Sequence, residues 1–216
     1  MSRDSIAARI IFSGVICLLC VLAPLAAAGP GSDWNRILRS MPTTGDRSLG
    51  SADAPVIVLE YASASCPHCA IFHNKSFPQI RRDYVDTGKV RWIFRELPLD
   101  ELAMAAFMLA RCMPEEKYFT TVEALFIDQK LWMGIEPRKA FWQIMQRMGM
   151  SQDQFDGCLR RQDLSQSIYQ TAKQAVDEFG VKSTPTFFIN GERIRGTQEA
   201  HYFGTLIEGA LRKARQ

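Results

Sequence analysis

Two cysteines separated by two residues, Cys66 and Cys69, constrain the fold of this chain more than any other feature. Residues 56–61 are rich in β-branched side chains and are followed by small polar residues, a pattern that predicts a strand and then a loop. Apolar side chains in residues 70–80 recur at helical spacing. The cysteines are therefore expected in the first turn of a helix into which a strand leads.

This position predicts redox chemistry. The first turn of a helix presents unpaired N–H groups and the positive end of the helix dipole, so it favours a thiolate. Cysteines in such sites have pKa values below the value of about 8.5 of a free thiol, and we expect Cys66 to be the nucleophile and Cys69 to resolve mixed disulfides. Pro67 suits the first helical turn, and His68 is expected to stabilise the thiolate. Because a stabilised thiolate favours the reduced form, the disulfide is expected to oxidise other thiols.

A Cys-x-x-Cys pair is also compatible with half of a zinc site, with His68 and His73 as further ligands. Outside the first 28 residues, the chain has no second closely spaced pair of cysteines or histidines, and the remaining histidine is His201. Haem attachment requires a histidine directly after the motif, where this chain has Ala70. We therefore expect neither a metal nor a cofactor, and we expect His73 to be an exposed or half-buried helix residue that takes no part in the chemistry.

Residues 1–28 predict a secretory signal peptide. Two arginines precede an uncharged apolar run at residues 10–22, and an A-x-A pattern follows at residues 26–28. The apolar run approaches the length of a membrane span, so a retained N-terminal anchor is the alternative to cleavage. Cys17 and Cys20 lie in this run and are expected to be removed with it. Export predicts a periplasmic location.

Removal of residues 1–28 leaves four of the six cysteines: the motif pair, Cys112 and Cys158. An even number suits an oxidising compartment, where Cys112 and Cys158 are candidates for a structural disulfide. Such a bridge closes a loop of about 46 residues and contributes about 4 kcal/mol in the chain-entropy model. Since both residues fall on apolar helix faces, two buried free thiols are the alternative.

Length and charge limit the remaining possibilities. After signal removal the chain is long enough for one well-buried domain, and the 216-residue sequence has a formal net charge of only +3. It has no repeat and no long basic run, so no nucleic-acid partner is expected. Residues 29–53 form an N-terminal lead-in with an amphipathic piece around Trp34 and Leu38, which is too short for a dimerisation domain. We expect a monomer.

The order of predicted elements indicates the α/β class. Residues 90–95 predict a second strand, and several amphipathic helices follow. Strands return at residues 186–189 and 193–195 around an Asn-Gly turn, which is a strong hairpin signal, and residues 200–213 predict a closing helix. This order predicts a small mixed sheet, interrupted in sequence by a helical insertion, with helices packed on it.

Two motifs together resemble a known family. The CPHC sequence at residues 66–69 and the TPTFFING sequence at residues 184–191 are similar to the DsbA family of thiol-disulfide oxidoreductases, from about Gly50 to the C-terminus. The resemblance implies a thioredoxin-like fold with a large helical insertion between the central strands. Residues 54–99 and 177–216 are then the thioredoxin-like domain, and residues 100–176 are the insertion.

The resemblance also implies roles for individual residues. Cys66 is the nucleophile, Cys69 its buried partner, and His68 the residue that tunes the thiolate. Pro185 is expected to be cis and to turn the backbone of Thr184 toward the sulfur atoms, so that both residues, with Pro67, contact an extended substrate peptide. From the sequence alone, an ordinary trans proline at the start of a strand is the alternative.

Glu60 matches a family acidic residue beneath the active site that helps to move protons to or from Cys69. The alternative is an ordinary carboxylate at the end of a strand. Its basic partner is expected to be Arg91 or Arg95 in the next strand.

The implied activity is the transfer of disulfides to cysteine-containing exported polypeptides, followed by reoxidation by a quinone-linked membrane partner of the DsbB type. Thr184 before the proline is also found in disulfide isomerases and reductases, so these activities are alternatives, although the chain lacks the dimerising domain of dedicated isomerases. The Cys112–Cys158 pair resembles alphaproteobacterial members. A third alternative is a non-catalytic chaperone of the same fold.

Overall fold

The computed structural model describes residues 30–216, with side chains from Trp34 onward. They contain a five-stranded mixed sheet in the order β1-β3-β2-β4-β5. The strands are β1 (Arg47–Leu49), β2 (Val56–Ala62), β3 (Val90–Glu96), β4 (Thr186–Ile189) and β5 (Glu192–Arg195). β2 and β3 are parallel, and every other neighbouring pair is antiparallel. The predicted α/β class and the mixed sheet are confirmed.

The sequence identified the central strands but not the edge strand β1. β2 is buried along almost its whole length, and its near-continuous apolar run is typical of a strand covered on both faces. β1 has three residues, Arg-Ser-Leu, and only its middle residue is exposed, so it has no apolar run to detect. The Asn-Gly hairpin is confirmed, since Asn190 and Gly191 both have a positive φ, of 44° and 94°.

Helices connect and cover these strands. They are α1 (Pro30–Arg39), α2 (Pro67–Ile71), α3 (Phe77–Ile80), α4 (Glu101–Cys112), α5 (Tyr118–Ile127), α6 (Gln129–Trp132), α7 (Pro137–Arg147), α8 (Gln152–Leu159), α9 (Gln162–Asp177) and α10 (Ala200–Ala214). π-helical turns at Phe72–Ser76 and Arg81–Val85 follow α2 and α3. Pro78 has no N–H to continue the regular hydrogen-bond ladder, which accounts for the first of these turns. No helix in residues 30–216 is both long and apolar enough to span a membrane.

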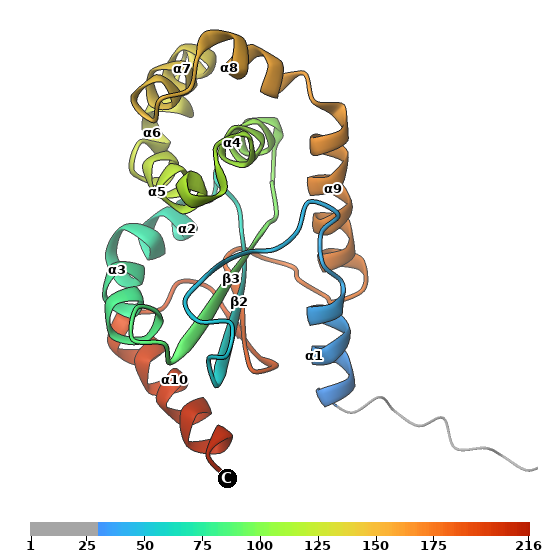
Figure 1. Ribbon diagram of the computed structural model, residues 1–216, viewed down its shortest axis with the longest axis vertical. Coiled ribbons are helices and arrows are strands. Elements are labelled where there is room, and N and C mark those ends of the chain that lie inside the picture. Colours follow the sequence, from blue (N-terminus) through green and yellow to red (C-terminus); the bar gives the residue numbers. More distant parts are fainter. Residues whose placement is uncertain (1–29) are drawn as a thin grey trace, which may run out of the picture.

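The two faces of the sheet are covered by different helices (Figure 1). α10 and the helical segment that follows the motif pack on one face around an aromatic cluster that includes Phe72, Trp92 and Phe203. α1 and the C-terminal half of α9 pack on the other face, where Ile37 and Phe179 are buried. The central strands, and whatever lies at their C-terminal ends, are therefore held from both sides.

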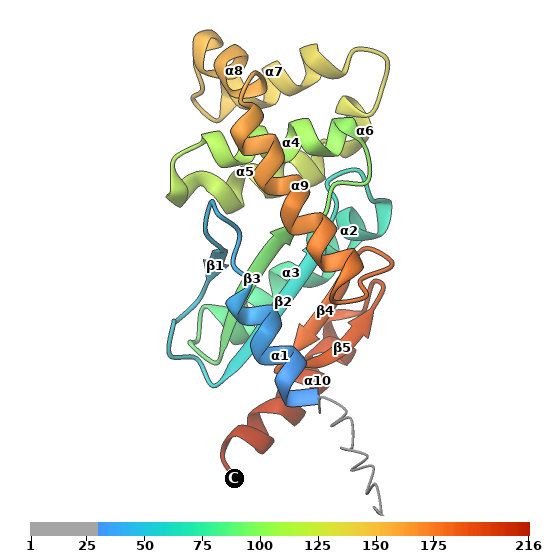
Figure 2. The same ribbon diagram turned by 90° about the vertical axis from the view of Figure 1, so that its right-hand side faces the viewer.

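α9 links the sheet to the other inserted helices (Figure 2). Its N-terminal residues Leu164 and Ile168 pack in the core formed by α4 to α8. Its later residues Ala172 and Ala175 pack with the sheet. One helix thus contributes to both cores, and the division of the chain at residues 176 and 177 stays a prediction. The predicted signal peptide lies outside the described residues.

The predicted disulfide is formed in the structure. Cys112 at the end of α4 and Cys158 in α8 are bonded, with their Cα atoms 6.1 Å apart. The bond joins two helices of the insertion, and the alternative of two free thiols does not apply.

Replacing both Cys112 and Cys158 with serine is expected to lower the free energy of unfolding by about 4 kcal/mol, because the unfolded chain regains the freedom of a 46-residue loop. Urea unfolding followed by circular dichroism measures this difference. The control compares the native protein and the variant under the same reducing conditions, where the motif is reduced in both and the two should unfold at a similar urea concentration once the Cys112–Cys158 bond is open. Equal stability of the variant and the oxidised native protein would contradict the prediction.

Candidate active site

The cysteine motif lies where the sequence predicts it. β2 ends at Ala62, and the chain turns through a short loop in which the Cys66 N–H donates to the Ser63 carbonyl at 3.2 Å. Cys66 is the N-cap of α2, with extended backbone angles, and Pro67 is the first helical residue. The Cys66 carbonyl accepts the first helical hydrogen bond, from Ala70 N–H. The sulfur of Cys66 is thereby held at the N-terminus of a helix.

The loop before β4 faces this helix. The Thr184–Pro185 peptide is cis, as predicted. In its protonated form, Cys66 Sγ donates a hydrogen bond to the Thr184 carbonyl at 3.3 Å. The hydroxyl of Thr184 is buried and has no hydrogen-bond partner among the described residues, so it is available to donate to a Cys66 thiolate. The two motifs, which are more than a hundred residues apart in the sequence, are therefore in contact through the sulfur of Cys66.

The two thiols of the motif have opposite acidities. A hydrogen bond from the Cys69 thiol makes the largest contribution and lowers the pKa of Cys66 to about 5, although burial opposes this effect. Thr184 and the backbone N–H groups of Cys69 and His68 also lower the pKa of Cys66. Burial raises the pKa of Cys69 well above its ordinary value, and the negative charges of Cys66 and Glu60 add to this effect. At neutral pH the site therefore holds a Cys66 thiolate and a protonated Cys69.

The reduced protein is expected to gain stability relative to the oxidised protein as the pH rises from about 5. Folding lowers the pKa of Cys66 to about 5, whereas the unfolded chain keeps the ordinary value of about 8.5, so the folded reduced protein binds fewer protons between these values. This stabilisation is complete above about pH 8.5 and is lost as the pH falls through 5. Cys69 titrates above this range.

Urea unfolding of both redox forms at pH 5 and pH 7 tests this prediction. The oxidised protein is the matched control, since it has every other titratable group but no free thiol in the motif. The difference in unfolding free energy between the two forms should grow from pH 5 to pH 7. A difference that is the same at both pH values would contradict it.

His68 and Pro67 are exposed. The carbonyl of His68 accepts a hydrogen bond from the Thr197 hydroxyl at 2.7 Å. Its effect on the pKa of Cys66 comes from the backbone N–H. The proposed tuning by its imidazole therefore stays a prediction.

Glu60 is completely buried and its charge raises the pKa of Cys69, but neither predicted arginine is its partner. Arg95 instead makes a two-point ion pair with Asp46 in the N-terminal lead-in, at 2.8 and 3.0 Å. The strand register explains the error: Glu60 lies opposite Phe94 and Arg95 opposite Tyr61, and successive side chains of a strand point to opposite faces. Arg91 shares the face of Arg95, so both arginines lie on the wrong side of the sheet.

The partner of Glu60 is His73, which was expected to be an exposed or half-buried helix residue with no part in the chemistry. That expectation is wrong: His73 is 4% exposed, and its Nε2 lies 2.9 and 3.1 Å from the two carboxylate oxygens of Glu60. Trp92 Nε1 donates to the same carboxylate at 3.0 Å. A signal for His73 was present, because it follows the inward-facing Cys69 by four residues and therefore shares its helix face.

Gln129 is a further residue that the sequence analysis missed. It lies at the start of α6, is buried, and donates from Nε2 to the carbonyls of Ala64 at 2.7 Å and Cys66 at 3.0 Å. The helical insertion thus holds the loop that carries the nucleophile. No local pattern marks this residue, since the contact spans more than sixty positions of the sequence.

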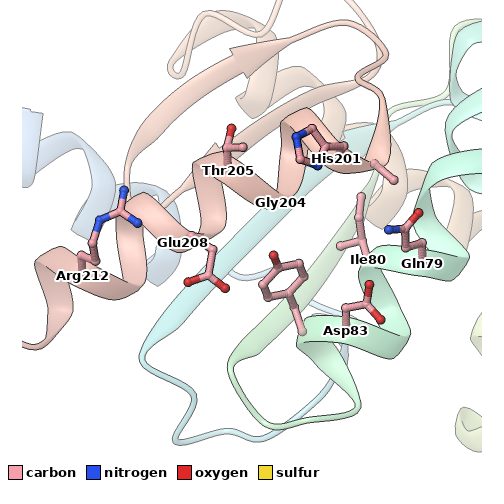
Figure 3. Close-up of a pocket in the computed structure, with 10 residues that line it drawn as sticks. Gln79, Ile80, Asp83, His201, Gly204, Thr205, Glu208 and Arg212 are labelled. Atoms are coloured by element: carbon pink, nitrogen blue, oxygen red, sulfur yellow. The ribbon is translucent and has the colours of Figure 1, made fainter.

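The alternative of a zinc site at the motif requires further metal-binding side chains close to the two cysteines. Among residues 30–216, no cluster of three or more His, Cys, Asp or Glu side chains is placed to hold a metal ion. A pocket of about 380 Å³ lies between α3 and α10 and is lined by polar residues that include Asp83, His201 and Glu208 (Figure 3). No residue of the two sequence motifs lines it, so it is separate from the candidate active site.

Fold and site together define a thioredoxin-fold protein with a Cys-x-x-Cys site that faces a cis-proline loop. The sequence model of the thioredoxin family matches residues 42–209. The crystal structure of alpha-DsbA1 from Wolbachia pipientis is 31% identical, with a TM-score of 0.77, over 82% of this chain and 96% of that chain. The chain belongs to the DsbA family of thioredoxin-like proteins.

Other relatives extend the comparison. A Rickettsia conorii protein with the provisional name protein-disulfide oxidoreductase is 29% identical over 173 residues, which are 79% of this chain and 62% of that protein. The chain therefore spans about three fifths of the length of this relative. A protein-disulfide isomerase from Novosphingobium aromaticivorans shares the fold, with a TM-score of 0.70 and 24% identity over 77% of this chain and 97% of that chain.

Proposed function

We propose that this protein is a thiol-disulfide oxidoreductase that introduces disulfides into exported proteins. The observation that carries the proposal is the opposed acidity of the two thiols: the pKa of Cys66 is lowered to about 5, whereas the pKa of Cys69 is raised. A stabilised Cys66 thiolate favours the reduced form of the site, so the oxidised form readily accepts electrons from other thiols. The names of the relatives support the same chemistry.

The proposed reaction has two exchange steps. A substrate thiolate attacks Cys66 Sγ of the oxidised site, which forms a mixed disulfide and releases Cys69 as a thiolate that takes up a proton. A second substrate thiolate then attacks the substrate sulfur of the mixed disulfide and releases the Cys66 thiolate. Two substrate thiols are oxidised to one disulfide, and the disulfide of the enzyme is reduced to two thiols. The backbone beside Pro185 pairs with the extended substrate, and Pro67 contacts it.

The cellular setting is part of the proposal. The sequence of residues 1–28 supports export to the periplasm, with an N-terminal anchor as the alternative. The family resemblance supports cysteine-containing exported polypeptides as substrates and a quinone-linked membrane partner of the DsbB type as the oxidant of the reduced enzyme. We propose that the protein acts as a monomer.

Isomerase or reductase activity is the second candidate. It is favoured by Thr184 before the cis-proline, a residue found in isomerases and reductases of this fold, and by the likeness in fold to a protein-disulfide isomerase. A chaperone without exchange activity is the third candidate, and the reactive thiol pair argues against it.

The test is the equilibrium of the purified protein with glutathione, followed by its oxidation of a reduced peptide. An oxidase should have a reduction potential at or above that of the glutathione pool, about −220 to −260 mV, and should oxidise the peptide rapidly. A potential near that of thioredoxin, about −270 mV, would reject the oxidase and favour the reductase or isomerase. If Cys66 and Cys69 do not exchange with glutathione at all, both enzymatic candidates are rejected and the chaperone is the remaining candidate.

A further inference from the structure

Glu60 and His73 form a buried pair close to the motif, since His73 follows Cys69 by four residues in the helical segment and the charge of Glu60 raises the pKa of Cys69. The side chain of His73 is 2% exposed and that of Glu60 is 0% exposed. The carboxylate accepts from His73 Nε2 and from Trp92 Nε1, at distances between 2.9 and 3.1 Å. Among the described residues, no lysine or arginine forms an ion pair with Glu60, so these two N–H groups alone stabilise its negative charge.

Aromatic side chains surround the His73 ring. The ring stacks on Phe126, with centroids 4.5 Å apart, and lies against Phe77 and Phe94. Its Nδ1 is buried and has no hydrogen-bond partner among the described residues. An unpaired N–H in this aromatic environment is costly, so the geometry favours an N–H on Nε2, where it donates to Glu60.

In the exchange reaction, Cys69 must take up one proton when the disulfide opens and lose it when the disulfide closes. When the disulfide opens, Cys69 leaves as a buried thiolate with no solvent contact, since its exposed fraction is 0%. When the disulfide closes again, the Cys69 thiol must lose that proton. The charge of Glu60 raises the pKa of Cys69, and β3 and α5 contribute Trp92, Phe94 and Phe126 to the contacts of the pair.

We propose that His73 is the positioning residue that allows Glu60 to exchange a proton with Cys69. On opening, the proton moves from the Glu60 carboxyl group to the Cys69 sulfur, and the carboxylate that remains is held by the N–H groups of His73 and Trp92. On closing, the Cys69 proton returns to this carboxylate and the free sulfur attacks Cys66. Both motif cysteines are free thiols in the structure. The inference rests on the proposed function.

The test uses the His73→Phe variant, which keeps the aromatic packing but removes the N–H donor. The motif is first charged with glutathione at Cys66, and closure of the intramolecular disulfide is followed by tryptophan fluorescence across a range of pH. Because loss of the donor disfavours the Glu60 carboxylate, we expect the midpoint of the pH profile to rise by about one unit in His73→Phe. His73→Gln retains an N–H donor and should recover more than half of that shift.

Two further variants separate a specific role from a structural one. In a Glu60→Gln background, His73→Phe should cause no additional shift, since the group it acts through is gone. His201→Phe, a matched change at an exposed histidine, should leave the profile as in the native protein. Should His73→Phe fail to fold, Trp92→Phe removes the other donor and should shift the midpoint in the same direction.

The outcomes distinguish this inference from the proposed function. An unshifted profile in His73→Phe, or a shift that persists in the Glu60→Gln background, would overturn the role of His73 while leaving exchange activity intact. A native protein that forms no mixed disulfide with glutathione would instead reject the proposed function itself.

Discussion

Replacing Cys66 with serine is expected to abolish disulfide exchange. Replacing Cys69 with serine is expected to stop the reaction at the mixed disulfide between Cys66 and the substrate. Cys66 is the thiol whose pKa is lowered to about 5, and its sulfur contacts the loop proposed to bind substrate. Without it no mixed disulfide forms, and the rate should fall to that of the uncatalysed reaction. Cys69 is fully buried and is the thiol that attacks Cys66 to resolve the mixed disulfide, so its loss should leave Cys66 bound to substrate.

Incubation of each variant with a disulfide-containing peptide, followed by non-reducing electrophoresis and mass spectrometry, measures both effects. The Cys69→Ser variant should accumulate a stable adduct at Cys66, and the Cys66→Ser variant should accumulate none. His201→Phe, a change at an exposed histidine away from the motif, is the control for protein preparation and folding. Adduct formation at Cys69 in the Cys66→Ser variant would reverse the proposed roles.

Replacing Arg111 with methionine is expected to lower the free energy of unfolding by about 3–5 kcal/mol, because it leaves the charge of Glu96 buried without its counterion. Glu96 is 1% exposed, and its carboxylate accepts from Arg111 at 2.5 and 2.8 Å and from the Tyr118 hydroxyl at 2.7 Å. Burial and the charge of Glu96 raise the pKa of Tyr118, so its hydroxyl stays protonated and donates. Arg111 also donates to the Thr44 carbonyl at 3.1 Å, so its replacement also removes a hydrogen bond to the N-terminal lead-in, residues 29–53.

Urea unfolding of the variant and the native protein, both with the Cys112–Cys158 bond intact, measures this effect. Arg138→Met is the matched control, since Arg138 is exposed and its ion pair with Asp156 should be worth no more than about 1 kcal/mol. A loss of similar size in both variants would show that Arg111 acts only as a surface charge. Replacing Glu96 with glutamine in the Arg111→Met background should restore part of the stability, because the buried charge is then removed.

Much of the candidate site was predictable because it depends on local sequence. The CPHC motif after a β-branched run predicted a cysteine at the N-cap of a helix, and Cys66 is at that position. The hairpin depends on Asn190 and Gly191, which accept positive φ at low cost. The cis peptide before Pro185 was predicted from the family motif.

The sequence by itself therefore determined that Cys66 begins a helix and where the strands other than β1 lie, since these features depend on neighbouring residues and on side-chain periodicity. Only the tertiary structure decided which charges meet. Glu60 and Arg95 lie on adjacent strands, but the alternation of side chains sends them to opposite faces, so Glu60 pairs with His73 and Arg95 with Asp46. Gln129 contacts the Cys66 loop because the insertion folds back onto it, and a contact between such distant segments leaves no periodic signal in the sequence.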